Sequence, residues 1–337
     1  MRIKQCLPYD PRLLEFCENE NQLQTYKTYG ESGSIVNETA RRLDKDSSAV
    51  SKIVRGIQDR GRAQFGSLDW DDEVGEIVQR PLKILFFDIE SMFSTVATFR
   101  FYNQNFGHDN VLEYGYMISF AAKWLGTEEV IYEECRDKRG RNKTLVKKML
   151  ALFSLADVII GHNGRSFDIK FVKGEALRHG LDPPIPFKIV DTLAIVKEEF
   201  KLPRNSLEYV AEHVGVTPKS KHNKFPGIML WKECKKGNPE AWEEMKLYNI
   251  LDTEILESVY YKLRAWSTKH PNLGIFSLEN IPMCPKCQSI DLKKINSIPT
   301  NTQEYDGYRC NNCGGIARGP RTISPLEKRK ATLRNAT

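Results

Sequence analysis

The sequence predicts an α/β fold in which a mixed sheet is flanked by helices, preceded by a small helical domain and followed by a cysteine-rich module. Short apolar runs typical of buried strands alternate with stretches of helical periodicity between residues 81 and 274. The first 66 residues show helical spacing without a strand pattern, and four cysteines are clustered towards the C-terminus. With a prior of about 150 residues per domain, a chain of 337 residues suggests two or three units.

The strands expected in the central segment are short runs of apolar and β-branched residues, whereas the helices are longer and repeat apolar residues every three or four positions. The expected strands are residues 83–87, 116–122, 130–132, 157–160 and 188–190. The expected helices are residues 144–155, 166–179 and 239–266. Strands and helices mixed in this order indicate a layered α/β domain, whose ligands are expected beyond the strand ends.

Composition indicates a folded chain without a membrane segment. Hydrophobic residues make up 40% and charged residues 28%, which argues against wholesale disorder. No run approaches 18 apolar residues, and the N-terminus lacks the apolar stretch of a secretory leader. We therefore expect a soluble protein of the cytoplasm, or of the host-cell cytoplasm if the protein is phage-encoded, with no membrane partner.

Positive charge is concentrated at the C-terminus more than in the chain as a whole. The net charge is +6, and the residues from Arg318 onward carry six basic side chains against Glu327 alone. A basic tail suits a polyanionic partner such as nucleic acid, although a charged terminus that serves only solubility has the same composition.

Residues 35–60 are expected to form two helices joined by a short polar turn, with Ser47 and Ser48 available to cap the second. The stretch resembles the helix-turn-helix segments of phage and bacterial DNA-binding proteins. In that arrangement the second helix would present polar side chains to DNA. The residues expected on its exposed face are Ser51, Lys52, Arg55, Gln58 and Arg60. An ordinary helical hairpin would have a similar pattern.

Asp88 and Glu90 stand two positions apart at the end of an apolar strand, so both side chains leave the same face of the sheet. Two neighbouring carboxylates repel each other unless a cation neutralises them, which makes the pair a candidate site for a hard divalent ion. Acids that are merely solvated at a strand end are the alternative for the pair alone.

Three further residues extend this candidate site. Asp168 follows the strand at 157–160 and falls on the first turn of the next expected helix. Tyr248 and Asp252 are four positions apart in the long final helix, so the phenol and the carboxylate share one helix face. Each acid alone could be an ordinary solvated residue, but the three elements in this order together indicate a catalytic constellation.

With these residues in place, the chain resembles the DEDD superfamily of 3′–5′ exonucleases in its tyrosine-bearing branch, and particularly the proofreading domains of family B DNA polymerases. The fold of that family is ribonuclease H-like. The resemblance covers about 190 residues and is carried by three motifs with two supporting stretches. These are residues 87–90, His162 and Asn163 with 167–168, Tyr248 with Asp252, and the stretches 190–193 and 205–211.

The resemblance implies two catalytic Mg²⁺ or Mn²⁺ ions held by Asp88, Glu90, Asp168 and Asp252, with Tyr248 orienting the attacking water. Oxygen-only ligands agree with hard cations. Among the residues of these motifs, Ser91 and Asn163 are expected to contact the nucleic acid near its 3′ end. DNA is expected as the substrate in preference to RNA, because the likeness is to exonuclease domains of DNA polymerases.

Two other segments combine aromatic residues with possible nucleic-acid contacts. Residues 216–237 contain six lysines with Phe225 and Trp231, a mixture suited to the phosphates and bases of a single strand, or to a solvated loop; we single out Lys221 and Lys224. The segment between Glu90 and Tyr116 contains several aromatic residues, for which packing is favoured slightly over base stacking. They are Phe93, Phe99, Phe101, Tyr102 and Phe106.

The remaining motif is a pair of cysteine knuckles, two C-x2-C sequences separated by 22 residues. Four thiolates at this spacing are typical of a zinc ribbon and predict one structural Zn²⁺ ion. The ligands are Cys284, Cys287, Cys310 and Cys313. Ribbons commonly bind nucleic acid or protein, and the sequence leaves that choice open.

Together these features predict a metal-dependent 3′–5′ exonuclease that acts on DNA, and the lysine-rich segment favours single-stranded DNA. An exoribonuclease with the same site is the first alternative, and a DNA-binding regulator that keeps the nuclease fold as a scaffold is the second. The predicted parts are a helical head, a linker, the exonuclease core, the zinc ribbon and a basic tail. Their ranges are 1–66, 67–80, 81–274, 280–320 and 321–337.

Overall fold

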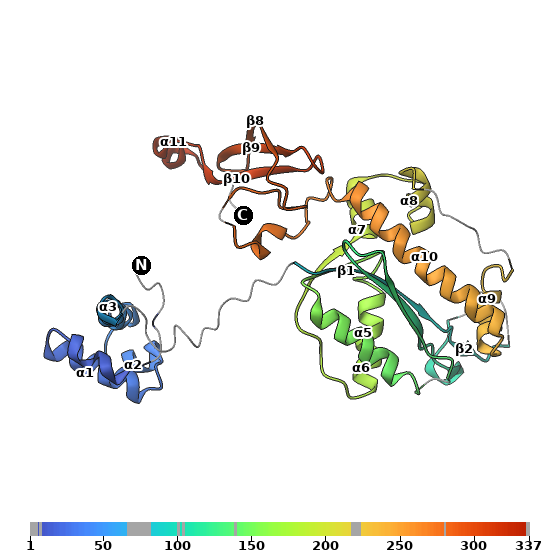
Figure 1. Cartoon of the computed structure of the whole chain (residues 1–337), viewed down its shortest axis with the longest axis horizontal. Helices are drawn as coiled ribbons and strands as arrows, with labels where there is room; N and C mark the ends of the chain where they lie inside the picture. The colour runs from blue at the N-terminus through green and yellow to red at the C-terminus, as the bar shows by residue number, and fades with distance from the viewer. Residues whose placement is uncertain are drawn as a thin grey trace. The chain divides into compact units, whose positions relative to one another are not determined.

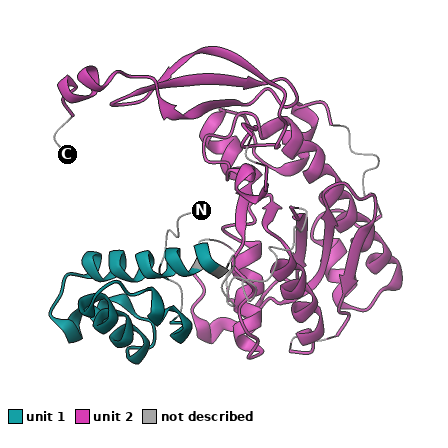
Figure 2. Ribbon diagram, turned by 60° about the vertical axis from the view of Figure 1, so that its left-hand side comes forward, with its two compact units in different colours: residues 1–80 teal, residues 81–337 magenta. Residues whose placement is uncertain are grey.

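The structure is a computed structural model in which the chain forms two compact units, Met1–Arg80 and Pro81–Thr337 (Figure 2). The expected linker, 67–80, lies outside the residues that the structure describes. The described residues are 6, 9–65, 82–99, 102, 105–137, 140–216, 224–279 and 281–334. The finer division of the second unit into core, ribbon and tail stays our interpretation.

A five-stranded mixed sheet forms the centre of the second unit, in the order β5-β4-β1-β6-β7 (Figure 1). Strand β1 pairs antiparallel with β4 and parallel with β6, and β4–β5 and β6–β7 complete the sheet. The strands are β1 (Ile84–Ser91), β4 (Met117–Trp124), β5 (Val130–Glu134), β6 (Val158–Gly161) and β7 (Lys188–Asp191). The predicted α/β class with a mixed sheet is confirmed.

Helices cover both faces of this sheet. One face packs against α5 (Lys143–Leu155) and α6 (Asp168–Arg178). The opposite face packs against α7 (Thr192–Glu199), α8 (Leu207–His213) and α10 (Pro239–Leu263). Periodicity predicted α5, α6 and α10, with boundaries that differ by at most three residues, whereas it did not predict α7 and α8.

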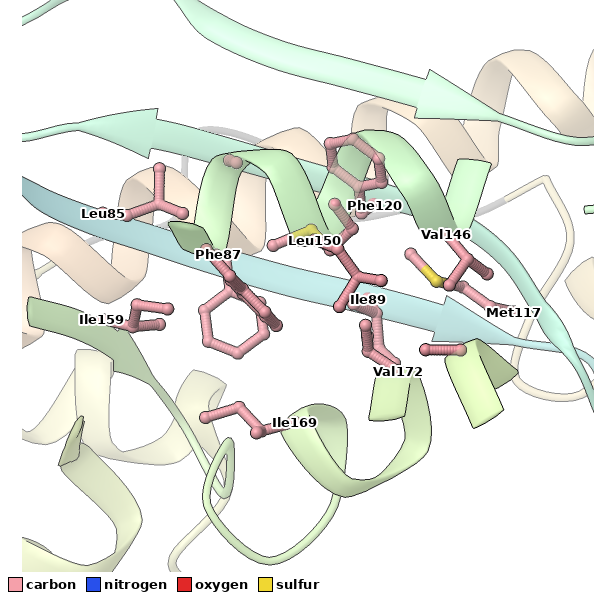
Figure 3. Packing of buried hydrophobic residues seen from close by; sticks show 14 of the residues in the cluster. Leu85, Phe87, Ile89, Met117, Phe120, Val146, Leu150, Ile159, Ile169 and Val172 are labelled. Atoms are coloured by element: carbon pink, nitrogen blue, oxygen red, sulfur yellow. The ribbon is translucent and has the colours of Figure 1, made fainter. Parts of the chain in front are cut away.

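The alternation of side chains along β1 divides the core into two clusters. Phe87 faces α5, where its ring lies 5.1 Å from that of Phe153, within the cluster that Figure 3 shows from close by. Phe86 faces α10, and its ring lies 5.6 Å from that of Tyr260. Because successive strand residues point to opposite faces, the even-numbered positions of β1 are directed towards α10.

Several short elements were not predicted from the sequence. The segment after β1 contains a small hairpin of β2 (Thr95–Val96) and β3 (Val111–Glu113), with a 3-10 turn η2 (His108–Asn110) before β3. Helix α9 (Met229–Lys235) precedes α10, and η3 (Leu273–Phe276) follows it. These elements have too few residues to show a clear hydrophobic period.

The aromatic residues after β1 correct the expectation that they pack. Phe99 and Tyr102 are almost fully exposed, and Phe106 is also exposed. Phe93 does pack, beneath the Lys235 ammonium, whose nitrogen lies 5.0 Å from the ring centroid. Phe101 lies outside the described residues. The composition of the segment could not distinguish these cases, because aromatic residues occur in cores and on binding surfaces alike.

The C-terminal part of the second unit is an antiparallel three-stranded sheet in the order β10-β9-β8. Its strands are β8 (Leu292–Pro299), β9 (Glu304–Cys310) and β10 (Ile316–Thr322). A short exposed helix, α11 (Leu326–Ala331), carries the basic residues that follow. Cys284 and Cys287 lie on the loop before β8, Cys310 is the last residue of β9, and Cys313 lies in the turn between β9 and β10.

The first unit is helical, as predicted. It contains a 3-10 helix η1 (Pro11–Phe16) and helices α1 (Glu20–Glu31), α2 (Val36–Leu43) and α3 (Ser47–Phe65). Its core is an apolar cluster shared by all four elements. The fully buried members are Leu13, Tyr26, Tyr29, Ala40, Val50, Val54 and Ile57.

Two expectations about α3 were wrong. Gln58 is buried and hydrogen-bonds to Tyr26, instead of lying on the exposed face. Arg60 is half-buried because its guanidinium donates to the Phe16 carbonyl (3.0 Å) and to Gln22 (2.7 Å). A helix of 19 residues packs on η1 as well as on α1 and α2, which turns its C-terminal half inward.

The cap of α3 also differs from the expectation. The Asp46 carboxylate accepts the backbone N–H groups of Ser48 and Ala49, at 2.8 and 3.2 Å, so the aspartate caps the helix instead of Ser47 or Ser48. Lys52 is exposed, whereas Arg55 is half-buried and donates to the Ser51 carbonyl. Within the described parts of the chain, no helix has the length and apolar character needed to cross a membrane.

Candidate functional site

Asp88 and Glu90 lie on the face of β1 that is directed towards α10. Glu90 is buried, and Asp88 keeps part of its side chain open to solvent. In the register of the sheet they stand beside Ala121 and Ser119 of β4, and the pairing shifts directly after Glu90. The small neighbouring side chains leave room for two carboxylates between the strand and the helix.

Asp168 is brought to the same place by the neighbouring strand. Strand β6 lies beside β1 and ends at Gly161, and the loop that follows leads into α6, whose first residue is Asp168. Its carboxylate is buried and accepts the backbone N–H of Ile89 in β1. This hydrogen bond ties the start of α6 to the segment between the two strand acids.

Tyr248 and Asp252 approach from α10. Their spacing of four residues puts both on one side of the helix, and the Tyr248 hydroxyl hydrogen-bonds to the Asp252 carboxylate. Both side chains are half-buried. The residues that the sequence singled out in three separate motifs therefore lie together between β1, α6 and α10.

The electrostatics confirm how close the four carboxylates are. Burial raises the pKa of Asp88, and the charges of Glu90, Asp168 and Asp252 raise it further. Burial and the charges of Asp252 and Asp168 raise the pKa of Glu90 to about 8. Burial is also the largest cause that raises the pKa values of Asp168 and Asp252, each to about 6. The main neighbouring charges are other carboxylates, so a proton or a cation relieves the repulsion.

The donor set fits hard divalent cations, because all four side chains offer oxygen ligands. Among the described residues, no three of these carboxylates have ligand atoms that all lie within 4.8 Å of one another, whereas the cysteines do. In this arrangement the described carboxylates are therefore more widely spread than the four cysteines.

Asn249 is a site residue that the sequence analysis missed. It is fully buried, and its side-chain N–H donates to the Asp88 carboxylate (2.7 Å) and the Asp88 carbonyl (3.3 Å). Its own carbonyl oxygen accepts from the Ser119 hydroxyl at 3.1 Å. These hydrogen bonds orient the Asp88 carboxylate. The bond from Asn249 lowers the pKa of Asp88, although burial, which raises it, has the larger effect. Its position directly after Tyr248 was the available signal.

Trp231 has contacts with the carboxylate site that the sequence analysis did not predict. The sequence placed it in a basic and aromatic segment suited to a nucleic-acid strand, but its indole hydrogen-bonds to Glu90. Its ring also packs edge-on against Tyr248, with centroids 6.1 Å apart. Trp231 thus positions two members of the carboxylate site from α9.

Asp191 holds the loop between β6 and α6. Its carboxylate accepts the backbone N–H groups of Asn163 (3.0 Å) and Arg165 (3.1 Å), and it also caps α7. The loop turns sharply at Asn163, where φ is +68°, a left-handed conformation that asparagine adopts more easily than most residues. His162 is fixed between the Thr192 hydroxyl and the Asn205 carbonyl. The approach of Asp168 therefore depends on several contacts outside the acids.

The predicted nucleic-acid contacts are not all gathered at this site. Ser91 follows Glu90 in β1, and Asn163 lies in the loop before Asp168. Lys224 is exposed and forms an ion pair with Glu240 at 2.6 Å, and Lys221 lies outside the described residues. Lys52 and Arg55 belong to the separate N-terminal unit. All six assignments stay predictions.

The four clustered cysteines could hold a zinc ion. Their sulfur atoms all lie within 4.8 Å of one another, and the Cys284–Cys313 and Cys287–Cys310 sulfur pairs are 3.6 Å apart. A tetrahedral Zn²⁺ with Zn–S bonds of about 2.3 Å needs sulfur pairs separated by about 3.8 Å. The structure thus has a thiolate cage of the size that a zinc ion requires.

Residues 85–264 match the model of the RNase H superfamily. Among solved structures, the chain is similar to the family B DNA polymerase from the hyperthermophilic archaeon Pyrobaculum calidifontis, with 22% sequence identity and a TM-score of 0.39. The similarity covers 56% of this chain and 26% of the polymerase chain, so the match spans about a quarter of that protein. No curated protein matches the chain.

The thiolate cage predicts that Cys284→Ser lowers the zinc content of the purified protein and unfolds the ribbon locally. A serine hydroxyl is a poor zinc ligand, and so small a sheet depends on the metal. Bound metal is measured by mass spectrometry under reducing conditions, with Cys17→Ser in the first unit as the control. A parent protein that contains no zinc when expressed in zinc-replete medium would contradict the assignment.

The raised pKa values predict that stability falls as pH rises in the absence of divalent cations other than zinc. Folded Asp168, Asp252 and Glu90 retain protons up to about pH 6 to 8, whereas unfolded carboxyls lose theirs near pH 4. The folded protein binds more protons in this window, so the free energy of unfolding decreases with pH. Added Mg²⁺ or Mn²⁺ should raise the melting temperature more at about pH 8 than at about pH 5.

Thermal unfolding at both pH values, with and without the cation, checks this expectation. The Asp252→Asn variant should show a smaller gain from the cation, while Glu212→Gln, on the exposed side of α8, should behave like the parent. An equal gain at both pH values would mean that the cation acts elsewhere.

Proposed function

Because this chain belongs to the RNase H superfamily, we propose that it is a metal-dependent nuclease that removes nucleotides from the 3′ end of single-stranded DNA. The observation that carries the proposal is the convergence of Asp88, Glu90, Asp168 and Asp252 beside Tyr248. A regulator that used the fold only as a scaffold would have no need to keep four carboxylates in mutual repulsion.

The four carboxylates would hold the catalytic Mg²⁺ or Mn²⁺ ions. When bound, such ions supply hydroxide at neutral pH and stabilise the oxygen that leaves a phosphodiester. Asn249 and Trp231 keep Asp88 and Glu90 in position as ligands. Burial in this site favours strong interaction with a divalent charge, because fewer waters compete for the carboxylates.

Tyr248 would position the attacking water. Its hydroxyl hydrogen-bonds to Asp252, and a phenol oxygen can accept as well as donate, so the hydroxyl and the carboxylate together would orient a water beside them. Burial and the surrounding acids raise the pKa of Tyr248, so the phenol stays protonated and serves as an orienting group and not as a base.

The preference for a 3′ end and for DNA rests on the motif resemblance to the tyrosine-bearing exonucleases. Within this proposal the ribbon and the N-terminal unit help to hold the substrate, the latter through Lys52 and Arg55 of α3. Since the two-ion chemistry does not read the 2′-hydroxyl, the assay of function includes RNA alongside DNA.

We expect the Asp88→Ala/Glu90→Ala variant to lose degradation while it still binds single-stranded DNA. The assay uses 3′-labelled and 5′-labelled single-stranded DNA, duplex DNA and RNA, each with Mg²⁺, with Mn²⁺ and with chelator. The matched control, Glu128→Ala/Glu129→Ala, removes two exposed acids and should degrade like the parent. Metal-dependent degradation that persists in the first variant would refute the site, and shortening from the 5′ end would refute the polarity.

Tyr248→Phe should slow the reaction on the order of 10²-fold, the contribution typical of one positioned group, without abolishing it. The matched control is Tyr261→Phe in the same helix, since the Tyr261 hydroxyl also donates to an acid four residues away, Glu257. Asp252→Asn should be more damaging because it removes a charge from the metal site. Release of mononucleotides is followed at saturating metal; a Tyr248→Phe variant as fast as the parent would make Tyr248 a packing residue.

A further inference from the structure

A groove separate from the carboxylate site lies between the end of α10 and the ribbon. Its volume is about 620 Å³. One wall is formed by residues 265–268 and His270, which follow α10, and the other by residues of the ribbon. The side chains that matter for its chemistry are Trp266, Lys286, Arg309, Ile316 and Arg318.

The two walls are held together by hydrogen bonds. Lys286, inside the first cysteine knuckle, is buried and donates to the Ala265 carbonyl at 2.5 Å. The Leu273 backbone N–H donates to the Pro285 carbonyl at 2.7 Å. The groove is thus built by contacts between buried or backbone groups.

The ribbon wall presents basic side chains from one face of its sheet. Ile316 and Arg318 are two positions apart in β10 and so share a face, and Arg309 of β9 stands opposite Ile316 in the register. Both arginines are exposed. The Arg318 guanidinium lies 4.2 Å from the centroid of the Tyr305 ring, and Arg309 donates one of its N–H groups to the Gly314 carbonyl. The remaining donors of each guanidinium can reach a phosphate.

The facing wall presents an aromatic ring. The Trp266 side chain is 61% exposed, although an indole is large enough to be costly to leave in water. Its ring is held edge-on against Phe200 of the core, with centroids 5.4 Å apart. A fixed, exposed indole opposite two arginines is suited to stack a nucleobase while the arginines bind the adjoining phosphates.

The charge of the groove selects an anionic ligand. Among the residues that the structure describes, its lining includes three cationic side chains and no aspartate or glutamate, while most of the remaining lining residues are apolar or small. A protein segment would need acidic and apolar residues in alternation to match this surface. Each nucleotide of a nucleic-acid strand carries one charged phosphate and one flat base, so the strand alternates charge and aromatic rings along its length.

The groove is within reach of the carboxylate site. Trp266 is 14 residues beyond Asp252, which corresponds to about 21 Å along a helix axis. A smaller cavity of about 190 Å³ shares Ser267 and His270 with the groove and extends to Arg165 and Asp191, in and beside the loop that leads to Asp168. Because this smaller cavity is lined by Asp191 and Glu198 as well as by Arg165 and Lys269, it continues the groove without being a uniformly basic surface.

We propose that this groove binds single-stranded nucleic acid, with a base stacked on Trp266 and phosphates at Arg309 and Arg318. That the bound part of the strand lies upstream of its 3′ end rests on the proposed function, whereas binding of a strand in the groove does not. The groove makes the ribbon part of the substrate-binding surface, and it lengthens the strand that the protein recognises beyond the terminal nucleotides.

Binding is tested with the full chain in the Asp88→Ala/Glu90→Ala background, so that the probe is not degraded. The probes are fluorescein-labelled DNA and RNA strands of about 30 nucleotides, and strands of about 4 nucleotides, the lower limit of sites that such proteins use. The variants are Trp266→Ala and Arg309→Ala/Arg318→Ala. The controls are Tyr102→Ala, which removes an exposed aromatic side chain elsewhere, and Lys328→Ala/Lys330→Ala, which removes two charges from α11.

Trp266→Ala should weaken binding of the long strand by about 5- to 150-fold, the range for loss of one stacked base, and Trp266→Phe should restore most of it. The double arginine variant should reduce the slope of log affinity against log salt by about 1.4, because two phosphate contacts are lost. The parent should bind the long strand more tightly than the short strand. Both groove variants should lose most of this difference in affinity. Zinc content and melting temperature verify that each variant is folded.

Parent-like affinity and salt slope in the arginine variant, for both DNA and RNA, would overturn the proposal. So would an equal loss in the Tyr102→Ala and Lys328→Ala/Lys330→Ala controls, because the groove would then have no special role. A protein that binds through the groove but has no nuclease activity in the parent background would refute the proposed function and leave the groove assignment standing. The two failures are thus distinguishable.

Discussion

Repulsion among Asp88, Glu90, Asp168 and Asp252 is the constraint on which the arrangement of the core depends. Acids in such proximity raise one another's pKa values, in addition to the larger effect of burial, and they come from a strand and two helices that are distant in the sequence. The apolar clusters on both faces of the sheet must supply the stability that offsets this repulsion. Strand β1 contributes to both sides of that balance, since its two faces carry the apolar core and the acids.

The polar groups around the acids limit the ways in which the repulsion can be relaxed. Asn249 holds Asp88, Trp231 hydrogen-bonds to Glu90, and the Ile89 backbone N–H donates to Asp168. Because these three acids are held by α10, α9 and β1, their carboxylates cannot simply turn away into solvent. In the proposed function, such restraints would reduce the reorganisation that binding of a divalent cation requires.

The ribbon is joined to the surface of the core by hydrogen bonds. Its thiolates form a closed cage, and a lysine within the first knuckle ties that cage to the residues after α10. Metal binding by the cysteines and the shape of the neighbouring groove are therefore physically linked, because loss of the metal would free the knuckle that carries Lys286. The small cysteine-bearing sheet thus completes a surface of the larger core through the buried Lys286 contact and the Leu273–Pro285 backbone hydrogen bond.

The sequence by itself determined the fold class, the main strands and helices, and the motifs that contain Asp88, Asp168 and Asp252, because hydrophobic period and residue spacing are local properties. It also determined the cysteine cage, since two short motifs specify it. Only the tertiary structure decided that Gln58 is buried, that Trp231 and Asn249 serve the carboxylates, and that Phe99 and Tyr102 are exposed. These outcomes depend on which distant surface each side chain meets. Those surfaces form only when the elements pack together, so the hydrophobic period of a single element cannot predict them.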